Sequence, residues 1–137
     1  MRRRVCAGLM LAAALFVAGC DNDVENLPPT TPAPTTTDTF TGSLSINGAQ
    51  THAFAVIAAG TVTATLTEVT PDPAIAVGLE LGTWNGISCT VVISNGNAIQ
   101  GNALIGNVTG VGSLCVRIHD TGKLTNSLDY KLTVVHP

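Results

Sequence analysis

The chain has 137 residues, enough for one domain of common size. Hydrophobic residues make up 45% and charged residues 11%, a composition that supports a buried core and excludes disorder along the whole chain. Beyond residue 19 the chain keeps three basic and nine acidic residues, a formal charge of −6. Such a surface repels phosphate backbones, so we expect no nucleic-acid partner.

The first 19 residues read as an export signal. Arg2–Arg4 supply a positive start, and Val5–Ala18 form an apolar run. That run is shorter than the ~20 residues of a membrane-spanning helix. An ordinary secretory signal fits these features as well.

The end of this segment, Leu15-Phe16-Val17-Ala18-Gly19-Cys20, resembles the lipobox of bacterial lipoproteins. In that family the cysteine sulfur receives a diacylglycerol, and cleavage then frees its amine for a further acyl chain. The resemblance implies a lipoprotein signal peptide over 1–19 and lipidation of Cys20, with fatty acyl chains such as palmitate holding the protein to a membrane. We therefore expect a location in the bacterial cell envelope, facing the periplasm or the exterior. Inner and outer membrane both remain open.

Residues 20–39 lack apolar periodicity. Their Leu27–Thr37 stretch is rich in proline and threonine. Proline fixes the backbone angle φ and removes an N–H donor, so we expect an extended, solvated tether that spaces the domain from the lipid.

Residues 40–137 alternate apolar and polar side chains, the pattern of half-buried β-strands. In Thr61–Thr67, for example, Val62, Ala64 and Leu66 point one way and four threonines the other. No convincing helical pattern follows the signal. We expect seven to eight strands in an antiparallel β-sandwich. The strands are predicted at 40–46, 52–56, 61–67, 75–81, 89–93, 114–119 and 130–134, with a weaker one between 98 and 112, and turns at 47–48, 58–60, 82–86, 95–97 and 120–122.

The segments Phe40–Leu44, His52–Val56 and Gly60–Thr67, with the later Gly112–Asp120 and Tyr130–Val134, resemble the bacterial pre-peptidase C-terminal domain family. The resemblance implies a jelly-roll-like sandwich of the kind appended to secreted proteases and other exported proteins. Leu114 departs from the family, which usually has an aromatic residue there. Because no protease precedes the domain in this chain, the family's role beside a protease is not carried over.

Of the four cysteines, Cys6 lies in the signal and Cys20 is the lipid site. An even pair, Cys89 and Cys115, remains in an exported domain, so we predict a disulfide that closes a loop of about 26 residues. Cys115 lies between the apolar residues Leu114 and Val116, and adjacent residues of a strand point to opposite faces. We therefore expect the bridge at a sheet edge or on the outer face. Two cysteines without CxxC spacing are too few for zinc, and we expect no metal and no cofactor.

Asp120-Thr121-Gly122 matches the signature triplet of aspartic proteases. In a homodimer of chains of this size, each chain would supply one of the two catalytic carboxylates. Lys123 follows it where those enzymes have a small residue, so we favour an acidic turn with Asp120 as its cap. His52, His119 and His136 show no nucleophile–base spacing, and we expect strand-end histidines on the surface. We predict no catalytic residues.

Trp84, between two glycines, is the best candidate for a ligand contact, because a sugar ring stacks on such a side chain. The alternative is a tryptophan folded over the end of the sandwich. The acids Asp72, Glu80, Asp120 and Asp129 are scattered, without the spacing of a calcium loop.

Together these features predict a membrane-anchored envelope lipoprotein and no enzyme. Its sandwich would be a binding, adhesion or structural accessory module for an envelope protein or glycan. The alternative is a carbohydrate-binding module that uses Trp84.

Overall fold

Eight β-strands form within residues 31–137, the range that the structure, a computed structural model, describes. Successive side chains of a strand point to opposite faces, so each alternating segment buries one face and exposes the other. No helix in this range is long and apolar enough to cross a membrane. The strands are β1 (Thr36–Leu44), β2 (Ala49–Val56), β3 (Gly60–Thr70), β4 (Val77–Trp84), β5 (Cys89–Ala98), β6 (Ala103–Val108), β7 (Gly112–His119) and β8 (Leu128–His136).

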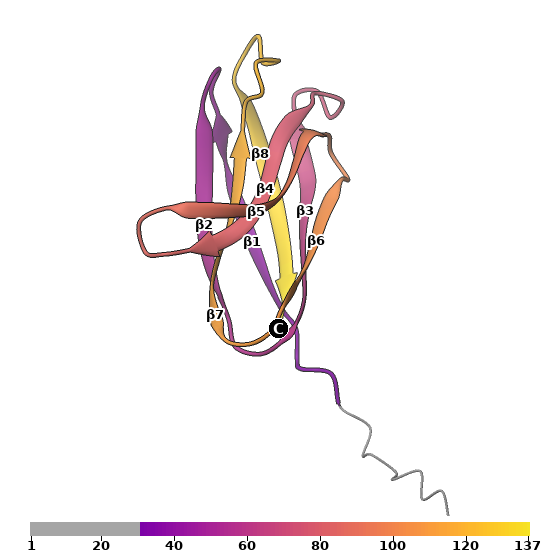
Figure 1. The fold of residues 1–137 in the computed structure, drawn as a ribbon. Coiled ribbons are helices and arrows are strands. Elements are labelled where there is room, and N and C mark those ends of the chain that lie inside the picture. Colours follow the sequence, from indigo (N-terminus) through magenta and orange to yellow (C-terminus); the bar gives the residue numbers. More distant parts are fainter. Residues whose placement is uncertain (1–30) are drawn as a thin grey trace, which may run out of the picture. The chain divides into compact units, whose positions relative to one another are not determined.

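The strands make two antiparallel four-stranded sheets that pack against each other (Figure 1). The first sheet has the order β1-β8-β3-β6 and the second the order β2-β7-β4-β5. Apart from the β4–β5 hairpin, every connection between consecutive strands passes from one sheet to the other. An eight-stranded double sheet wound in this way is a jelly roll. The predicted antiparallel, jelly-roll-like β-sandwich is confirmed.

The core lies between the sheets and takes side chains from every strand. The predicted half-buried strand is β3, in which Val62, Ala64 and Leu66 are fully buried. The threonines between them are exposed or half-buried on the outer face, as the alternation predicts. Tyr130 in β8 and Phe54 in β2 are the buried aromatic residues of this core.

The domain begins earlier than predicted. β1 starts at Thr36, inside the segment assigned to the tether, because residues 36–39 pair with residues 133–136 of β8. The last proline of the tether is Pro34, and the threonines after it have the N–H groups and β-branched side chains that a strand needs. The signal, with Cys6, the lipidation site Cys20 and the tether up to residue 30 lie outside the described residues.

Of the predicted turns, the one at 82–86 is displaced and the one at 95–97 is wrong. Residues 82–84 belong to β4 and residues 95–97 to β5, since pairing between these strands runs from Trp84↔Cys89 to Val77↔Ala98. The chain turns instead at 85–88 and at 99–102, where Gly101 has a positive φ of 92°. The weakly patterned segment between 98 and 112 does contain a strand, β6.

Candidate functional site

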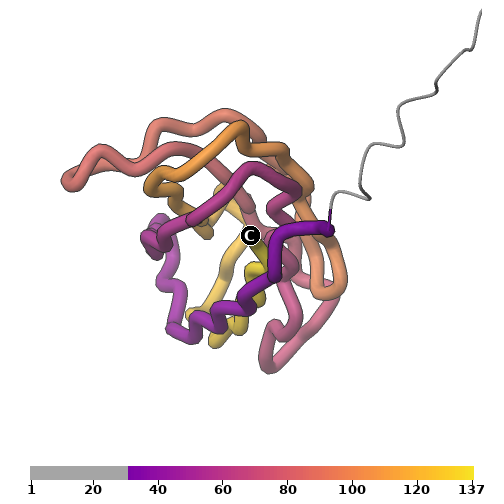
Figure 2. Tube along the Cα trace, turned by 90° about the horizontal axis from the view of Figure 1, so that it is seen from below, coloured from indigo at the N-terminus to yellow at the C-terminus, as the bar shows by residue number. Residues whose placement is uncertain are grey.

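The β4–β5 hairpin projects sideways from the rest of the domain, as the salmon-coloured arm in Figure 2 shows. Residues 84–92 form its end and are called the projecting hairpin below. Three aliphatic side chains on it face solvent: Ile87 is 89% exposed, Val92 69% and Val91 41%. Such neighbouring exposed apolar residues mark a contact surface more often than isolated ones do.

The turn of this hairpin is held by its own hydrogen bonds. The side-chain oxygen of Asn85 accepts from the backbone N–H groups of Ile87 (2.9 Å) and Ser88 (2.7 Å). The Asn85 N–H donates to the Ser88 carbonyl (3.2 Å), and Gly86 supplies the positive φ of 96° that this turn requires. Ile87 is therefore presented on an ordered turn.

An apolar pocket of about 170 Å³ adjoins the projecting hairpin, between the edge strands β5 and β6. Val92 is the extra residue of a β-bulge, because Leu81 pairs with Ile93 while the next residue, Gly82, pairs with Val91. Gly106 keeps the pocket open, since a β-carbon there would lie 3.0 Å from Ile93. The lining residues are Val62, Leu81, Gly82, Thr83, Val92, Ile93, Gly106, Asn107, Val108 and Leu114, none of them charged.

The Cys89–Cys115 disulfide, predicted from the sequence, attaches the hairpin to β7. Its two Cα atoms lie 5.8 Å apart, and it crosses β4 on the outer face of the second sheet. The outer-face position agrees with the prediction, and Cys115 is nevertheless fully buried. The reason is that β5 folds over this face at Gly82, where a β-carbon would meet the Thr90 carbonyl.

Trp84 ends β4 opposite Cys89 and is half-buried. The polar side chains of the adjoining turn, Asn85 and Ser88, bond each other at 3.1 Å. Trp84 therefore has a partly accessible ring, as the sugar-binding prediction needs, but the polar groups closest along the chain are already paired.

His52 is half-buried on the inner face of β2, where the edge strands β1 and β2 face each other. Its Nε2 is 2.8 Å from the hydroxyl of Tyr130, and its ring stacks on Phe40 at a centroid distance of 4.7 Å. Burial lowers the pKa of His52 and raises the pKa of Tyr130. The two groups therefore form a neutral hydrogen-bonded pair at neutral pH.

His136 is also internal, with 3% of its surface exposed, so its expected surface position is wrong. It shares the inner face of β8 with Val134, since alternate residues point the same way. Its Nε2 lies 3.0 Å from Oδ2 of Asp38, and its ring packs 5.1 Å from that of Phe54. The early start of β1 brings Asp38 to this position.

His119 lies on the outer face of the second sheet, away from the other two histidines. Its ring covers Gly78, where a β-carbon would lie 2.1 Å from it. Its Nδ1 is 3.7 Å from Oε2 of Glu80, which accepts from Arg117 at 2.6 Å. The three histidines thus occupy three separate environments, and the structure does not gather them into one site.

Asp120 caps the loop after β7, as the alternative to the protease triplet predicts. Its Oδ1 accepts from the backbone N–H groups of Gly122 (2.8 Å) and Lys123 (2.9 Å), while its Oδ2 accepts from that of Asn47 (2.8 Å). The Asn47 bond first, and then those within the loop, hold the pKa of Asp120 below its ordinary value. This carboxylate joins the 120–124 loop to the β1–β2 turn.

The remaining acids also have local partners. Asp72 accepts from the Ala74 N–H at 2.9 Å, and Asp129 accepts from the hydroxyl of Ser43. Within residues 31–137, no three His, Cys, Asp or Glu side chains lie together as a metal site would require.

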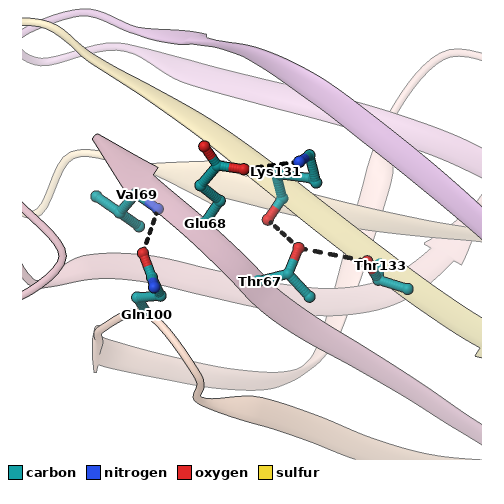
Figure 3. Close-up of polar contacts among 6 residues, drawn as sticks. All are labelled: Thr67, Glu68, Val69, Gln100, Lys131 and Thr133. Carbon is teal, nitrogen blue, oxygen red and sulfur yellow. Dashed lines mark hydrogen bonds and ion pairs between the residues drawn. The ribbon is translucent and has the colours of Figure 1, made fainter. Parts of the chain in front are cut away.

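An open hollow of about 430 Å³ lies on the outer face of the first sheet. A bulge in β3 leaves Thr67 as an extra residue, and its hydroxyl donates to the Lys131 carbonyl at 3.0 Å (Figure 3). Glu68 pairs with the Lys131 ammonium at 2.6 Å, and Gln100 accepts from the Val69 N–H at 2.9 Å. These groups hold the bulge in place. The hollow is lined by Thr41, Gly42, Ser43, Glu68, Thr70, Asp129, Tyr130 and Lys131.

The aliphatic residues of the projecting hairpin were not singled out from the sequence. The sequence feature that could have indicated them is the run Val91-Val92-Ile93, which breaks the alternation of apolar and polar residues. A strand with one solvent-exposed face rarely has three consecutive apolar residues.

No protein-family model matches the chain, and no curated protein matches it. The resemblances to the lipobox and to the pre-peptidase C-terminal family therefore stay predictions that rest on the residues quoted for them.

Proposed function

We propose that this chain is a lipid-anchored protein of the bacterial cell envelope whose β-sandwich is a non-catalytic binding module. The charged and apolar leader, the small residues before Cys20 and the proline-rich segment after it support the anchor. The Cys89–Cys115 disulfide supports an oxidising compartment outside the cytoplasm. The jelly-roll strand order is compatible with the proposed pre-peptidase C-terminal relationship.

The projecting hairpin carries the binding part of the proposal. It presents Ile87 on a hydrogen-bonded turn that the disulfide attaches to β7, so little conformational entropy is lost when a partner binds. The adjoining pocket accepts an apolar side chain in return. A hydrophobic centre of this kind, surrounded by polar strand residues, fits a protein partner. Aliphatic side chains offer a glycan neither a stacking surface nor hydrogen bonds.

Site-specific photo-cross-linking in the native envelope tests this assignment. A photoreactive residue is placed at Ile87, and in a matched control at Ile105, which is 63% exposed on β6 of the other sheet. We expect a discrete protein adduct from position 87 and none from 105. Filling the pocket by Gly106→Val should remove the adduct, while Gly112→Val, at a glycine with open space around it, should leave it unchanged.

Equal adducts from both positions, or none, would contradict a binding role for the hairpin. A glycan array covers the carbohydrate alternative: binding that disappears in Trp84→Ala but persists in Ile87→Ser would replace the protein partner by a sugar. Turnover of peptides or glycans that Asp120→Asn or His52→Gln abolishes would show an enzyme.

A further inference from the structure

One end of the sandwich, called the tether end, gathers four segments around the point where the chain enters. The pairs Thr36↔His136, Val56↔Gly112 and Gly60↔Val108 bring these segments to the same end of the two sheets. Figure 1 shows this end at the bottom with the C-terminus, and Figure 2 views the domain from that side. The segments are residues 31–35, the loops 57–59 and 109–111, and Pro137.

The tether end is apolar and carries no charged side chain in these four segments. Ile57 is 68% exposed and Val111 79% exposed, one on each loop. Around them lie alanine, glycine, proline and threonine, and residues Pro32 and Ala33 lie beside Ala59. A surface of this composition loses little solvation when it leaves water.

Among residues 31–137, charged side chains lie toward the opposite end. Asp38 is the exception, and His136 pairs with it at 3.0 Å. In the half of the domain opposite the tether end, the other five carboxylates outnumber three cations. An anionic membrane surface would therefore repel that half and favour approach by the tether end. These residues are Glu68, Asp72, Glu80, Asp120 and Asp129, with Arg117, Lys123 and Lys131.

The chain itself indicates what the tether end meets. Cys20, the proposed acylation site, precedes Thr35 by only 15 residues, a length of chain that spans at most about 55 Å. A domain held so close experiences the bilayer at an effective concentration on the order of millimolar, at which weak contacts are populated. We propose that the tether end docks on the phospholipid surface, with Ile57 and Val111 inserted among the headgroups. This inference rests on the proposed lipid anchor.

Tryptophan quenching on vesicles tests the orientation. Trp84, the single tryptophan, is replaced by phenylalanine, and one new tryptophan is introduced as Val111→Trp, Ile46→Trp or Ile87→Trp. Ile46 lies in the β1–β2 turn at the opposite end, and Ile87 on the projecting hairpin. The chain from residue 20 is attached to phosphatidylethanolamine–phosphatidylglycerol vesicles through a maleimide lipid on Cys20, with the Cys89–Cys115 disulfide intact. Lipids brominated in the acyl chain then act as the quencher.

If the tether end docks, the emission of a tryptophan at position 111 should shift to the blue and be quenched. The emission of a tryptophan at position 46 or 87 should show neither change. Quenching at 87 or 46 instead, or equal emission at all three positions, would overturn the inference. A second measurement, amide hydrogen exchange, needs no added tryptophan. Exchange in loops 57–59 and 109–111 should slow when the chain is attached to vesicles. The double variant Ile57→Asp/Val111→Asp should abolish that protection. The maleimide lipid supplies the anchor in this experiment, so its results do not depend on native acylation. A lack of native acylation would contradict the proposed function and leave the docking result unchanged.

Discussion

The carbonyl of Thr90 lies directly over the α-carbon of Gly82. A β-carbon at Gly82 would be 2.1 Å from the Thr90 oxygen and 2.9 Å from the α-carbon of Val91. This approach lets β5 fold across the outer face of β4 and reach β7, where Cys89 bonds Cys115. A missing side chain in β4 thus permits both the disulfide and the position of the projecting hairpin.

Gly82→Ala should destabilise the domain. The atoms it meets belong to backbone, which cannot rotate away, so we expect a loss of roughly 1–3 kcal/mol or more in the free energy of unfolding. Gly96→Ala in β5 is the matched control, because no atom lies within 4 Å of its added β-carbon. Urea denaturation followed by circular dichroism measures both. Equal stabilities for the two variants would show that β5 does not lie on Gly82.

Loss of the disulfide should cost stability and free the hairpin. For a closed loop of 26 residues, the chain-entropy relation gives a loss of about 3.5 kcal/mol for the double variant Cys89→Ala/Cys115→Ala. Reductant should lower the urea midpoint of the native chain and leave that of the double variant unchanged. A native chain that titrates two free thiols after oxidative purification would contradict the pairing.

The strands were largely predictable because burial of one face imposes a period of two. The alternation in 61–67 and in 130–134 corresponds to β3 and β8, where Val62, Leu132 and Val134 are fully buried. The errors arose where a local turn signal was overridden by pairing. Asn95-Gly96-Asn97 has the composition of a turn, yet β4 continues opposite it, so these residues stay in β5.

The candidate site was less predictable, because it depends on contacts between distant strands. The disulfide followed from the even cysteine count, but the burial of Cys115 depends on how β5 folds at Gly82. His136 was expected on the surface. Its buried position and its contact with Asp38 depend on the pairing of β1 with β8, which starts before Phe40.

Asp120 should contribute stability that acid removes. Its pKa is lowered in the folded state, so the contribution is present above the ordinary aspartate value of about 3.9 and is lost as the pH falls through the folded-state pKa. Asp120→Asn should lower Tm at pH 7 and flatten the decline of Tm in acid. Asp72→Asn, at a carboxylate with one backbone partner, should have a smaller effect. Identical acid profiles for native and Asp120→Asn chains would refute the capping role.

His52 should make the domain less stable at mildly acidic pH. Since burial lowers its folded-state pKa, the unfolded chain binds more protons, and stability falls once the pH drops below about 6.5. The loss should level off below the folded-state pKa. His52→Gln preserves a hydrogen-bonding side chain toward Tyr130 but does not titrate, so its stability should vary less between neutral and mildly acidic pH. Proton NMR titration of the His52 ring provides the direct check, and a pKa at or above 6.5 would falsify this assignment.

The anchor is the claim on which the cellular role depends, and intact-mass spectrometry of the protein extracted from its native membrane tests it most directly. We predict a chain that starts at Cys20, with acyl chains on that residue and residues 1–19 absent. A chain that retains Met1, or one that starts at residue 20 with an unmodified thiol, would contradict the account.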